Sequence, residues 1–225
     1  MDWTFADRAV YADGTLVVAD LHLGREAAAS VQVPVGGDED VLDRLDDLVS
    51  RFDPEEVVLA GDVLHSFGSV PDAVGETVAD LHDRIEAAGA RPVVTPGNHD
   101  VHLDAVWKGA TADAYRIGDA VICHGHERPS LDADAVVVGH DHPALAVEGQ
   151  KRPCFLRGPV AGFREVVMLP AFDRLASGVV VNEMRGGAFQ SPVIDDADAL
   201  CPVVWDTEAN QALEFPALAT FRKLL

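Results

Sequence analysis

The sequence predicts an α/β protein with two β-sheets, a βαβαβ core and helices on the outer faces. Its first half alternates three short apolar runs with two amphipathic segments of helical period, and each apolar run ends in a polar turn. Its second half consists of short apolar runs separated by turns, with few helix signals. No linker or internal repeat divides the chain, so we expect residues 1–225 to form a single domain.

Three buried strands and two helices make up the predicted core. The strands cover Thr15–Ala19, Val57–Ala60 and Pro92–Thr95. The helices cover Asp38–Phe52 and Pro71–Gly89, with apolar residues on one face, and a loop over Val31–Glu39 precedes the first helix. Because β-α-β crossovers are nearly always right-handed, the three strands should lie parallel with their polar turns at one edge of the sheet.

The second half is expected to build the second sheet. Short apolar runs separated by turns fit strands of an all-β region, and we expect residues 143–225 to complete that sheet. The predicted strands are Ala114–Ile117, Ala120–Cys123, Ala135–Val138, Leu145–Val147, Cys154–Leu156, Glu165–Leu169, Val179–Val181, Val203–Trp205 and Gln211–Phe215.

The chain is strongly acidic. It carries 17 Lys and Arg against 38 Asp and Glu, a net charge of −21. Such self-repulsion destabilises a compact state in ordinary buffer, whereas in roughly molar salt the Debye length falls to about 3 Å and the repulsion is largely screened. The composition therefore indicates a halophilic protein from a salt-adapted organism. It also shows no basic stripe of the kind that binds nucleic acids.

The sequence gives no sign of a membrane. The N-terminus Met1-Asp2-Trp3-Thr4 is acidic and lacks the basic flank of a signal peptide. No apolar run approaches the roughly 20 residues that span a bilayer. We therefore expect a cytoplasmic protein without a membrane partner.

Most of the histidines lie in motifs that follow predicted strands. Seven of the nine do so, alongside Asp20, Asp62 and Asn98, whereas histidines that only fill a core would be scattered through the elements. A nitrogen and oxygen ligand set without sulfur suits divalent ions such as Mn²⁺, Fe²⁺ or Zn²⁺. These groups exceed what one octahedral ion can use, so two metals bridged by a carboxylate are expected. The seven are His22, His65, His99, His124, His126, His140 and His142.

Five polar motifs follow one another within residues 20–142: Asp20-x-His22, Gly61-Asp62, Gly97-Asn98-His99-Asp100, His124 and Gly139-His140-x-His142. Their order resembles that of the calcineurin-like metallophosphoesterases. Further pieces are Ala19–Gly24, Gly61-Asp62-x-x-His65, Arg152-x-Cys154-Phe155 and Leu169-Pro-Ala-Phe172. They give a closer resemblance, over nearly the whole chain, to the PdeM type, phosphoesterases associated with DNA ligase. The resemblance implies the two-sheet metallophosphoesterase sandwich.

The resemblance implies a role for each motif residue. Asp20, His22, Asp62 and His142 would hold one divalent metal, and Asp62 would bridge to a second metal held by Asn98, His124 and His140. Mn²⁺ is the expected metal, with Fe or Zn as alternatives. A hydroxide bridging the two cations would attack phosphorus, while His99, oriented by Asp100, would protonate the leaving oxygen. Two such cations can stabilise both the attacking and the leaving oxygen.

Four further polar residues are candidates around this site. His65 and His126 either touch the substrate or support a metal ligand from behind. Arg25 and Arg128 either bind the second ester of a phosphodiester or are solvated arginines.

The function that follows is hydrolysis of nucleotide or nucleic-acid phosphodiesters, with DNA, RNA or a nucleotide as the partner and a nuclease among the alternatives. A phosphomonoesterase with the same dinuclear site would differ only in how the pocket treats the second ester. A catalytically silent interaction scaffold of the same fold is a third alternative. That alternative predicts eroded ligands, whereas all seven ligands and His99 are present. DNA-repair partners are implied by the resemblance alone.

Overall fold

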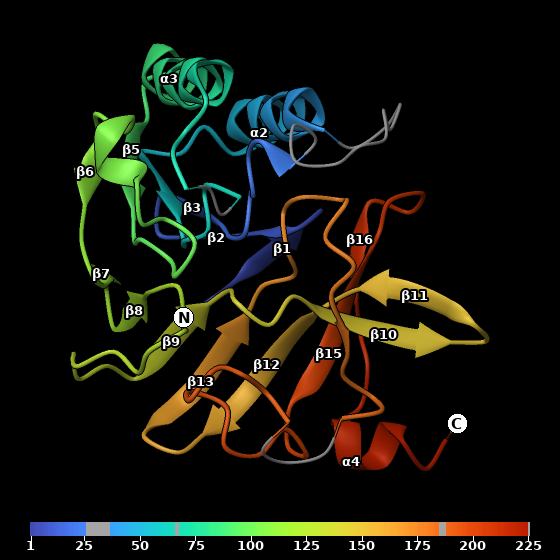
Figure 1. Ribbon diagram of the computed structural model, residues 1–225. Helices are drawn as coiled ribbons and strands as arrows, with labels where there is room; N and C mark the ends of the chain where they lie inside the picture. Colours follow the sequence, from blue (N-terminus) through green and yellow to red (C-terminus); the bar gives the residue numbers. More distant parts are fainter. Residues whose placement is uncertain (26–36, 66–67, 185–187, 225) are drawn as a thin grey trace.

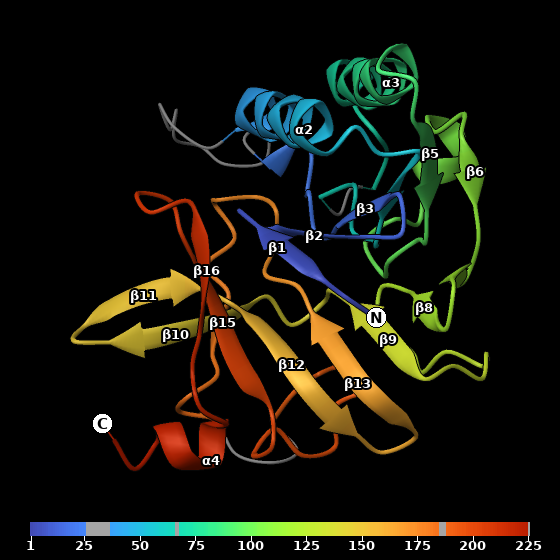
Figure 2. The ribbon, with the colours of Figure 1, turned by 180° about the vertical axis from the view of Figure 1, so that it is seen from behind.

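A computed structural model describes residues 1–25, 37–65, 68–184 and 188–224. Two large β-sheets pack face to face, and helices α2 and α3 cover the outer face of the first sheet (Figures 1 and 2). The predicted two-sheet α/β sandwich is confirmed. None of the helices in the described ranges has the length and apolarity needed to cross a membrane. Positions 31–36 of the loop expected over Val31–Glu39 lie outside the described residues, and Asp38 and Glu39 already belong to helix α2.

The first sheet has six strands in sequential order. Strands β3 to β6 are parallel, and β1 and β2 add antiparallel strands at one side. The parallel arrangement of β3, β4 and β5 is the one that the crossover rule predicted. The strands are β1 (Thr4–Ala6), β2 (Ala9–Ala12), β3 (Thr15–Val18), β4 (Glu56–Leu59), β5 (Arg91–Val94) and β6 (Ala110–Thr111).

Two amphipathic helices join the parallel strands. Helix α2 (Asp38–Phe52) begins with three acidic residues, which favour the positive end of the helix dipole, and it ends at Asp53, whose φ is 45°. Helix α3 covers Asp72–Ala87. Both helices bury the apolar face expected from their period against β3, β4 and β5. A single 3₁₀ turn, η1 (Leu103–Ala105), follows β5.

The second sheet has seven strands and is mixed. Residues after 143 supply four of these strands, and β13 pairs in parallel with β9 from the motif-bearing half. In sheet order the strands are β16 (Gln211–Glu214), β15 (Cys201–Asp206), β12 (Phe155–Val160), β13 (Phe163–Met168), β9 (Ala135–Val138), β8 (Ala120–Ile122) and β7 (Tyr115–Ile117). A separate three-stranded sheet contains β11 (Gln150–Pro153), β10 (Pro143–Val147) and β14 (Val179–Val180).

Alternate residues of the central strands pack into different hydrophobic cores. In β3, Leu16 and Val18 face the helices, while Val17 faces the second sheet. In β9, Val137 faces the first sheet and Val136 faces outward. This outer face of the seven-stranded sheet is covered by the segment 189–200 and the short helix α4 (Leu218–Phe221) rather than by long helices. Burial on both faces explains the continuous Val-rich runs.

Four short strands were not predicted. β1 and β2 form an N-terminal hairpin, β6 extends the first sheet, and β11 pairs with β10. Asp13-Gly14 is the hairpin turn between β2 and β3, with Ala12 opposite Thr15. Asp-Gly between two apolar runs is a signal that could have found β2.

Candidate active site

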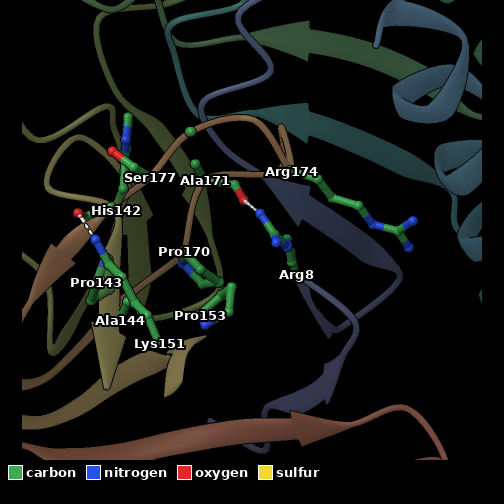
Figure 3. Close-up of a pocket in the computed structure, with 12 residues that line it drawn as sticks. Arg8, His142, Pro143, Ala144, Lys151, Pro153, Pro170, Ala171, Arg174 and Ser177 are labelled. Atoms are coloured by element: carbon green, nitrogen blue, oxygen red, sulfur yellow. Dashed lines mark hydrogen bonds between the residues drawn. The ribbon is translucent and has the colours of Figure 1, made fainter. Parts of the chain in front are cut away.

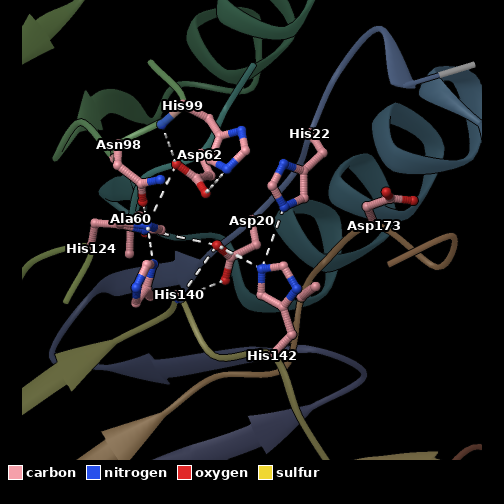
Figure 4. Close-up of polar contacts among 12 residues, drawn as sticks. Asp20, His22, Ala60, Asp62, Asn98, His99, His124, His140, His142 and Asp173 are labelled. Atoms are coloured by element: carbon pink, nitrogen blue, oxygen red, sulfur yellow. Dashed lines mark hydrogen bonds and ion pairs between the residues drawn. The ribbon is translucent and has the colours of Figure 1, made fainter. Parts of the chain in front are cut away.

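The ends of five strands bring the predicted motif residues together (Figure 4). The polar turns after β3, β4, β5, β8 and β9 all project from the carboxyl ends of parallel strands, where open sheets place their ligands. In that order, the turns carry Asp20 and His22; Asp62; Asn98, His99 and Asp100; His124; and His140 and His142.

The backbone of these turns is held in an unusual conformation. Five of the residues have left-handed φ values between 49° and 74°, a region that costs free energy for side chains other than glycine. Hydrogen bonds between the turns hold them there, from the Asp20 amide to the Gly61 carbonyl (3.0 Å) and from the His22 amide to the Asp62 carbonyl (2.9 Å). The five residues are Asp20, His22, Asp62, His140 and His142.

Two motif glycines leave room for buried carboxylates. A Cβ at Gly97 would lie 2.1 Å from Oδ1 of Asp62, and one at Gly139 would lie 2.5 Å from Oδ2 of Asp20. The glycines of Gly-Asn-His-Asp and Gly-His-Asp-His are therefore required by close approach. Only a residue without a side chain lets these turns reach the carboxylates.

One group of candidate ligands contains Asp20, His22 and His142. Nε2 of His142 lies 3.1 Å from Oδ1 of Asp20 and 3.4 Å from Nε2 of His22. Two ligand atoms that are each about 2.1 Å from one ion, at octahedral or tetrahedral angles, lie about 3.0–3.4 Å apart. The observed separations match that spacing.

A second group gathers around His124. Its Nε2 lies 3.2 Å from Oδ1 of Asn98, 3.2 Å from Nδ1 of His140 and 3.4 Å from Oδ1 of Asp62. Nδ1 of His124 faces the Ala60 carbonyl at 3.1 Å, a contact that fixes the ring with Nε2 toward the site. The two groups are adjacent, because ligand atoms of Asp20, Asp62 and His124 all lie within 4.8 Å of one another.

Burial sets the charge of these groups. It lowers the pKa of His22 to about 3 and also lowers the pKa of His124 and His140, so these rings are neutral near pH 7. For Asp62, burial and the nearby Asp20 carboxylate raise the pKa. Burial opposes ionisation of Asp20 as well, but the contact with His142 outweighs it and lowers the pKa of Asp20.

This donor set fits divalent cations. Two buried carboxylates converge here with imidazoles and an amide oxygen, and the two negative charges repel each other. A bound cation would relieve that repulsion and use the ring nitrogens that face one another. The residues of the two groups could therefore hold metal ions.

His99 lies at the rim of the site. Its side chain is 35% exposed, Nε2 is 4.0 Å from Oδ2 of Asp62, and its amide donates to Oδ1 of Asp62 (3.0 Å). We expected Asp100 to orient this imidazole, but the contacts are different. The Asp100 carboxylate accepts hydrogen bonds from the amides of Leu64 (2.9 Å) and Gly97 (2.8 Å). Asp100 therefore holds the turn that carries His99 and does not hold the ring, because its short side chain is used by backbone amides.

A polar cavity of about 300 Å³ opens over the site. Besides motif residues, the segment 176–179 and Gln190 line it, and sequence reasoning missed both. Asp141 connects the turn after β9 to the Gln190 loop, because its carboxylate accepts hydrogen bonds from the amides of Gln190 (2.8 Å) and Ser191 (2.9 Å). The acidic residue inside His140-Asp141-His142 was the signal that could have pointed to this loop.

Three of the four additional candidates lie at or beside the site, and one does not. Arg25 lines the cavity and forms an ion pair with Asp173, Nε to Oδ2 2.8 Å. The His65 ring lies 5.8 Å from that of His22, and the His126 ring lies 5.2 Å from that of His124, both between ring centroids. Arg128 is not brought to the site. Its guanidinium donates to the carbonyls of Ala161 and Pro192 and lies over the Phe163 ring.

A two-sheet α/β sandwich with candidate metal ligands at its strand ends is the arrangement expected of a metal-binding hydrolase of the metallophosphoesterase class. Comparison with known proteins agrees. Residues 15–126 match the family model of calcineurin-like phosphoesterases. A nuclease MPE from Pseudomonas putida is 25% identical, with a TM-score of 0.66 and 88% of each chain covered. The phosphoesterase YfcE from E. coli is 14% identical, with a TM-score of 0.45, covering 90% of this chain and 98% of its own.

No curated protein matches the chain. The family match and the shared fold nevertheless agree on one assignment. The chain belongs to the calcineurin-like metallophosphoesterase superfamily, whose members are hydrolases of phosphoesters and typically bind divalent metals.

Proposed function

We propose that this chain is a two-metal phosphodiesterase acting on nucleotide or nucleic-acid diesters. The observation that carries the proposal is the convergence of two adjacent ligand groups, centred on Asp20 and on His124, at separations that suit shared ions. The similarity to the Pseudomonas putida nuclease over 88% of both chains supports a diester over a monoester. We also propose that residues 1–225 work as one domain, since β13 pairs directly with β9.

Seven residues would hold the metals. Asp20, His22 and His142 would bind one ion, and Asn98, His124 and His140 the other, with Asp62 shared between them. When bound, two divalent cations supply Lewis acidity, which polarises phosphoryl oxygens and makes a water acidic enough to attack near pH 7. Mn²⁺ is the ion we propose, because the mixed oxygen and imidazole set suits it, with Fe or Zn as alternatives.

His99 would protonate the leaving oxygen. Its backbone amide is fixed on Asp62, and its ring stands at the mouth of the cavity rather than inside the ligand groups. Asp100 positions the turn from behind through two backbone amides. A group in this place can reach the departing ester oxygen while the phosphoryl group is held beneath it. Arg25, on the cavity wall, is placed to contact the second ester.

The choice between diester and monoester is tested with two chromogenic substrates. The purified chain, assayed with Mn²⁺ in molar salt, should hydrolyse bis-para-nitrophenyl phosphate with the higher kcat/KM, and para-nitrophenyl phosphate more slowly. A reversed preference would replace the proposal with a phosphomonoesterase. A folded, metal-loaded protein that cleaves neither substrate, nor any oligonucleotide, would favour a scaffold without catalysis.

A further inference from the structure

A second cavity, of about 260 Å³, adjoins the candidate active site (Figure 3). The two cavities share His142 and the segment 176–178 as a common wall. Besides His142, its charged lining residues are Arg8, Lys151 and Arg174, and none is acidic. In a chain with more than twice as many acidic as basic residues, such a lining is a strong local reversal of charge.

The cations continue beyond this cavity. A third cavity, of about 230 Å³, shares Arg8, Pro153 and Arg174 with the second and adds Arg152. The three cavities therefore follow one another outward from the metal ligands. We call Arg8, Lys151, Arg152 and Arg174 the cationic track. Its members come from the β1–β2 turn, from β11 and from the segment after β13, so they are distant in sequence.

Three of the four cations contact neutral oxygens. The Arg8 guanidinium donates to the carbonyls of Ala171 (2.7 Å) and Asp173 (2.9 Å). Lys151 donates to the Gly178 carbonyl, and Arg152 to the side-chain oxygen of Gln150 (3.0 Å). Arg174 forms an ion pair with Asp40 (2.9 Å), but its side chain is 43% exposed. These contacts orient the cations and leave positive charge available to a ligand.

Three carboxylates near these cavities are already engaged. Asp7, which lines the third cavity, pairs with Arg44 at 2.6 Å. Asp173 pairs with Arg25, and Asp141 accepts two backbone amides. With the charges of these described residues taken together, the cationic track therefore keeps a net positive charge.

We propose that the cationic track binds the phosphates that flank the scissile phosphodiester, so that the substrate is a polynucleotide strand rather than a small nucleotide ester. This proposal rests on the proposed function and adds to it where the remainder of the substrate lies. One phosphodiester would occupy the cavity over the metal ligands, and the next phosphates of the same strand would lie against Lys151 and Arg174, then against Arg152.

Electrostatics favours this placement. A molecule with a net charge of −21 repels a polyanion as a whole, so a strand can approach only where cations gather locally. In roughly molar salt the Debye length is about 3 Å, so cations in direct contact with a bound strand act on it while distant carboxylates are screened. Backbone phosphate contacts of this kind carry no sequence information, and a substrate selected by length and charge is expected.

The first test compares substrates of different length. With Mn²⁺, the unmodified chain should cleave a 12-nucleotide thymidylate strand with a KM at least about 10-fold below that of a dinucleotide. Lys151→Ala combined with Arg174→Ala should remove most of that advantage and leave kcat/KM for bis-para-nitrophenyl phosphate within about 2-fold. Arg164→Ala is the matched control, because its side chain is 84% exposed at the opposite end of β13.

The second test measures binding without turnover. In a His99→Ala background, the anisotropy of a fluorescein-labelled 12-mer should report a dissociation constant that rises with KCl. The slope of log affinity against log salt should fall by about 0.7 for each track cation removed. Matched DNA and RNA strands identify which polynucleotide is preferred.

The outcomes separate this proposal from the previous one. Equal KM values for the dinucleotide and the 12-mer, or a double variant that behaves like Arg164→Ala, would overturn the proposal that the cationic track binds phosphates. Continued turnover of bis-para-nitrophenyl phosphate in that case would still support the proposed phosphodiesterase function. Absence of hydrolysis with every diester would instead count against the proposed function.

Discussion

His99 is the residue on which the proposed chemistry depends most. His99→Ala should keep the bound metal and lower kcat by about 10²–10⁴-fold, because a general acid contributes roughly that factor. His102→Ala, three residues further along the same turn and outside the ligand groups, serves as the control. Metal content and kcat are measured on the same preparations. Turnover of His99→Ala at the level of the control would remove His99 from the mechanism.

Gly97 is predicted to be intolerant of the smallest side chain. A Cβ there would meet the Asp62 carboxylate at 2.1 Å and the Asp62 backbone nitrogen at 2.6 Å, so Asp62 must shift. Gly97→Ala should lose at least one metal per chain and destabilise the fold by about 1–3 kcal/mol, the usual range for overpacking. Gly68→Ala, where nothing lies within 4 Å, should change neither. Metal analysis and thermal unfolding measure the two effects. A Gly97→Ala variant with unchanged metal content and stability would contradict the close approach of Gly97 to Asp62.

At this scale the sequence predicted which residues meet, but not how they are held. Asp20, Asp62 and the strand-end histidines were found from their spacing, because parallel strands bring their ends to one edge. The contact of Asp100 with the Leu64 amide could not be foreseen, since Leu64 lies in the turn after β4. The left-handed φ values at Asp20 and His22 could not be foreseen either, because the hydrogen bonds that hold this turn come from Gly61 and Asp62 in the turn after β4.

At the scale of elements, Arg44 connects helix α2 to two other segments. It is 7% exposed, pairs with Asp7 in the β1–β2 turn and donates to the Phe172 carbonyl (2.7 Å). Phe172 in turn donates its amide to Ala19, next to the ligand Asp20 (2.8 Å).

Arg44→Ala should lower the free energy of unfolding by about 1–3 kcal/mol, because Asp7 and the Phe172 carbonyl lose a charged donor. Ser50→Ala, exposed on the same helix, should change it by less than about 0.5 kcal/mol. Urea denaturation followed by circular dichroism gives both values. Equal stabilities would mean that the Arg44 contacts add nothing to the fold.

Elements were predictable where their hydrophobic period was strong. Asp38–Phe52 was predicted with the bounds that the structure has, since its apolar positions repeat at helical spacing and Pro54 follows its end. The strand β11 was missed because all of its residues are exposed, so it has no apolar pattern, and its pairing with β10 is set by the turn between them.

At the scale of the whole molecule, the net charge of −21 predicts a salt-dependent fold. Raising KCl from 0.1 to 2 M should raise Tm, because the Debye length shrinks from about 10 Å to below 3 Å and repulsion between carboxylates is screened. Differential scanning calorimetry at several salt concentrations measures this. A Tm that falls or stays constant over the range would contradict the halophilic interpretation of the composition.

Charge arrangement is also the feature that sequence reasoning described least well. The sequence shows no basic stripe, yet folding gathers Arg8, Lys151, Arg152 and Arg174 along consecutive cavities. No local pattern records this, because the β1–β2 turn of the first sheet and β11 of the three-stranded sheet meet only through tertiary packing. The fold class and the ligand set are local enough to predict, whereas a surface made from cations of three separate segments is not.

The measurement that tests the central claim most directly is a titration of the metal-free chain with Mn²⁺ in molar salt, recording bound metal and diester hydrolysis together. We predict about two ions bound per chain and turnover that rises with the second ion, because the reaction needs both ligand groups filled. Asp62→Asn should fail to bind the second ion and to gain the turnover that depends on it. Full turnover with one ion per chain, or without any divalent ion, would contradict the two-metal account.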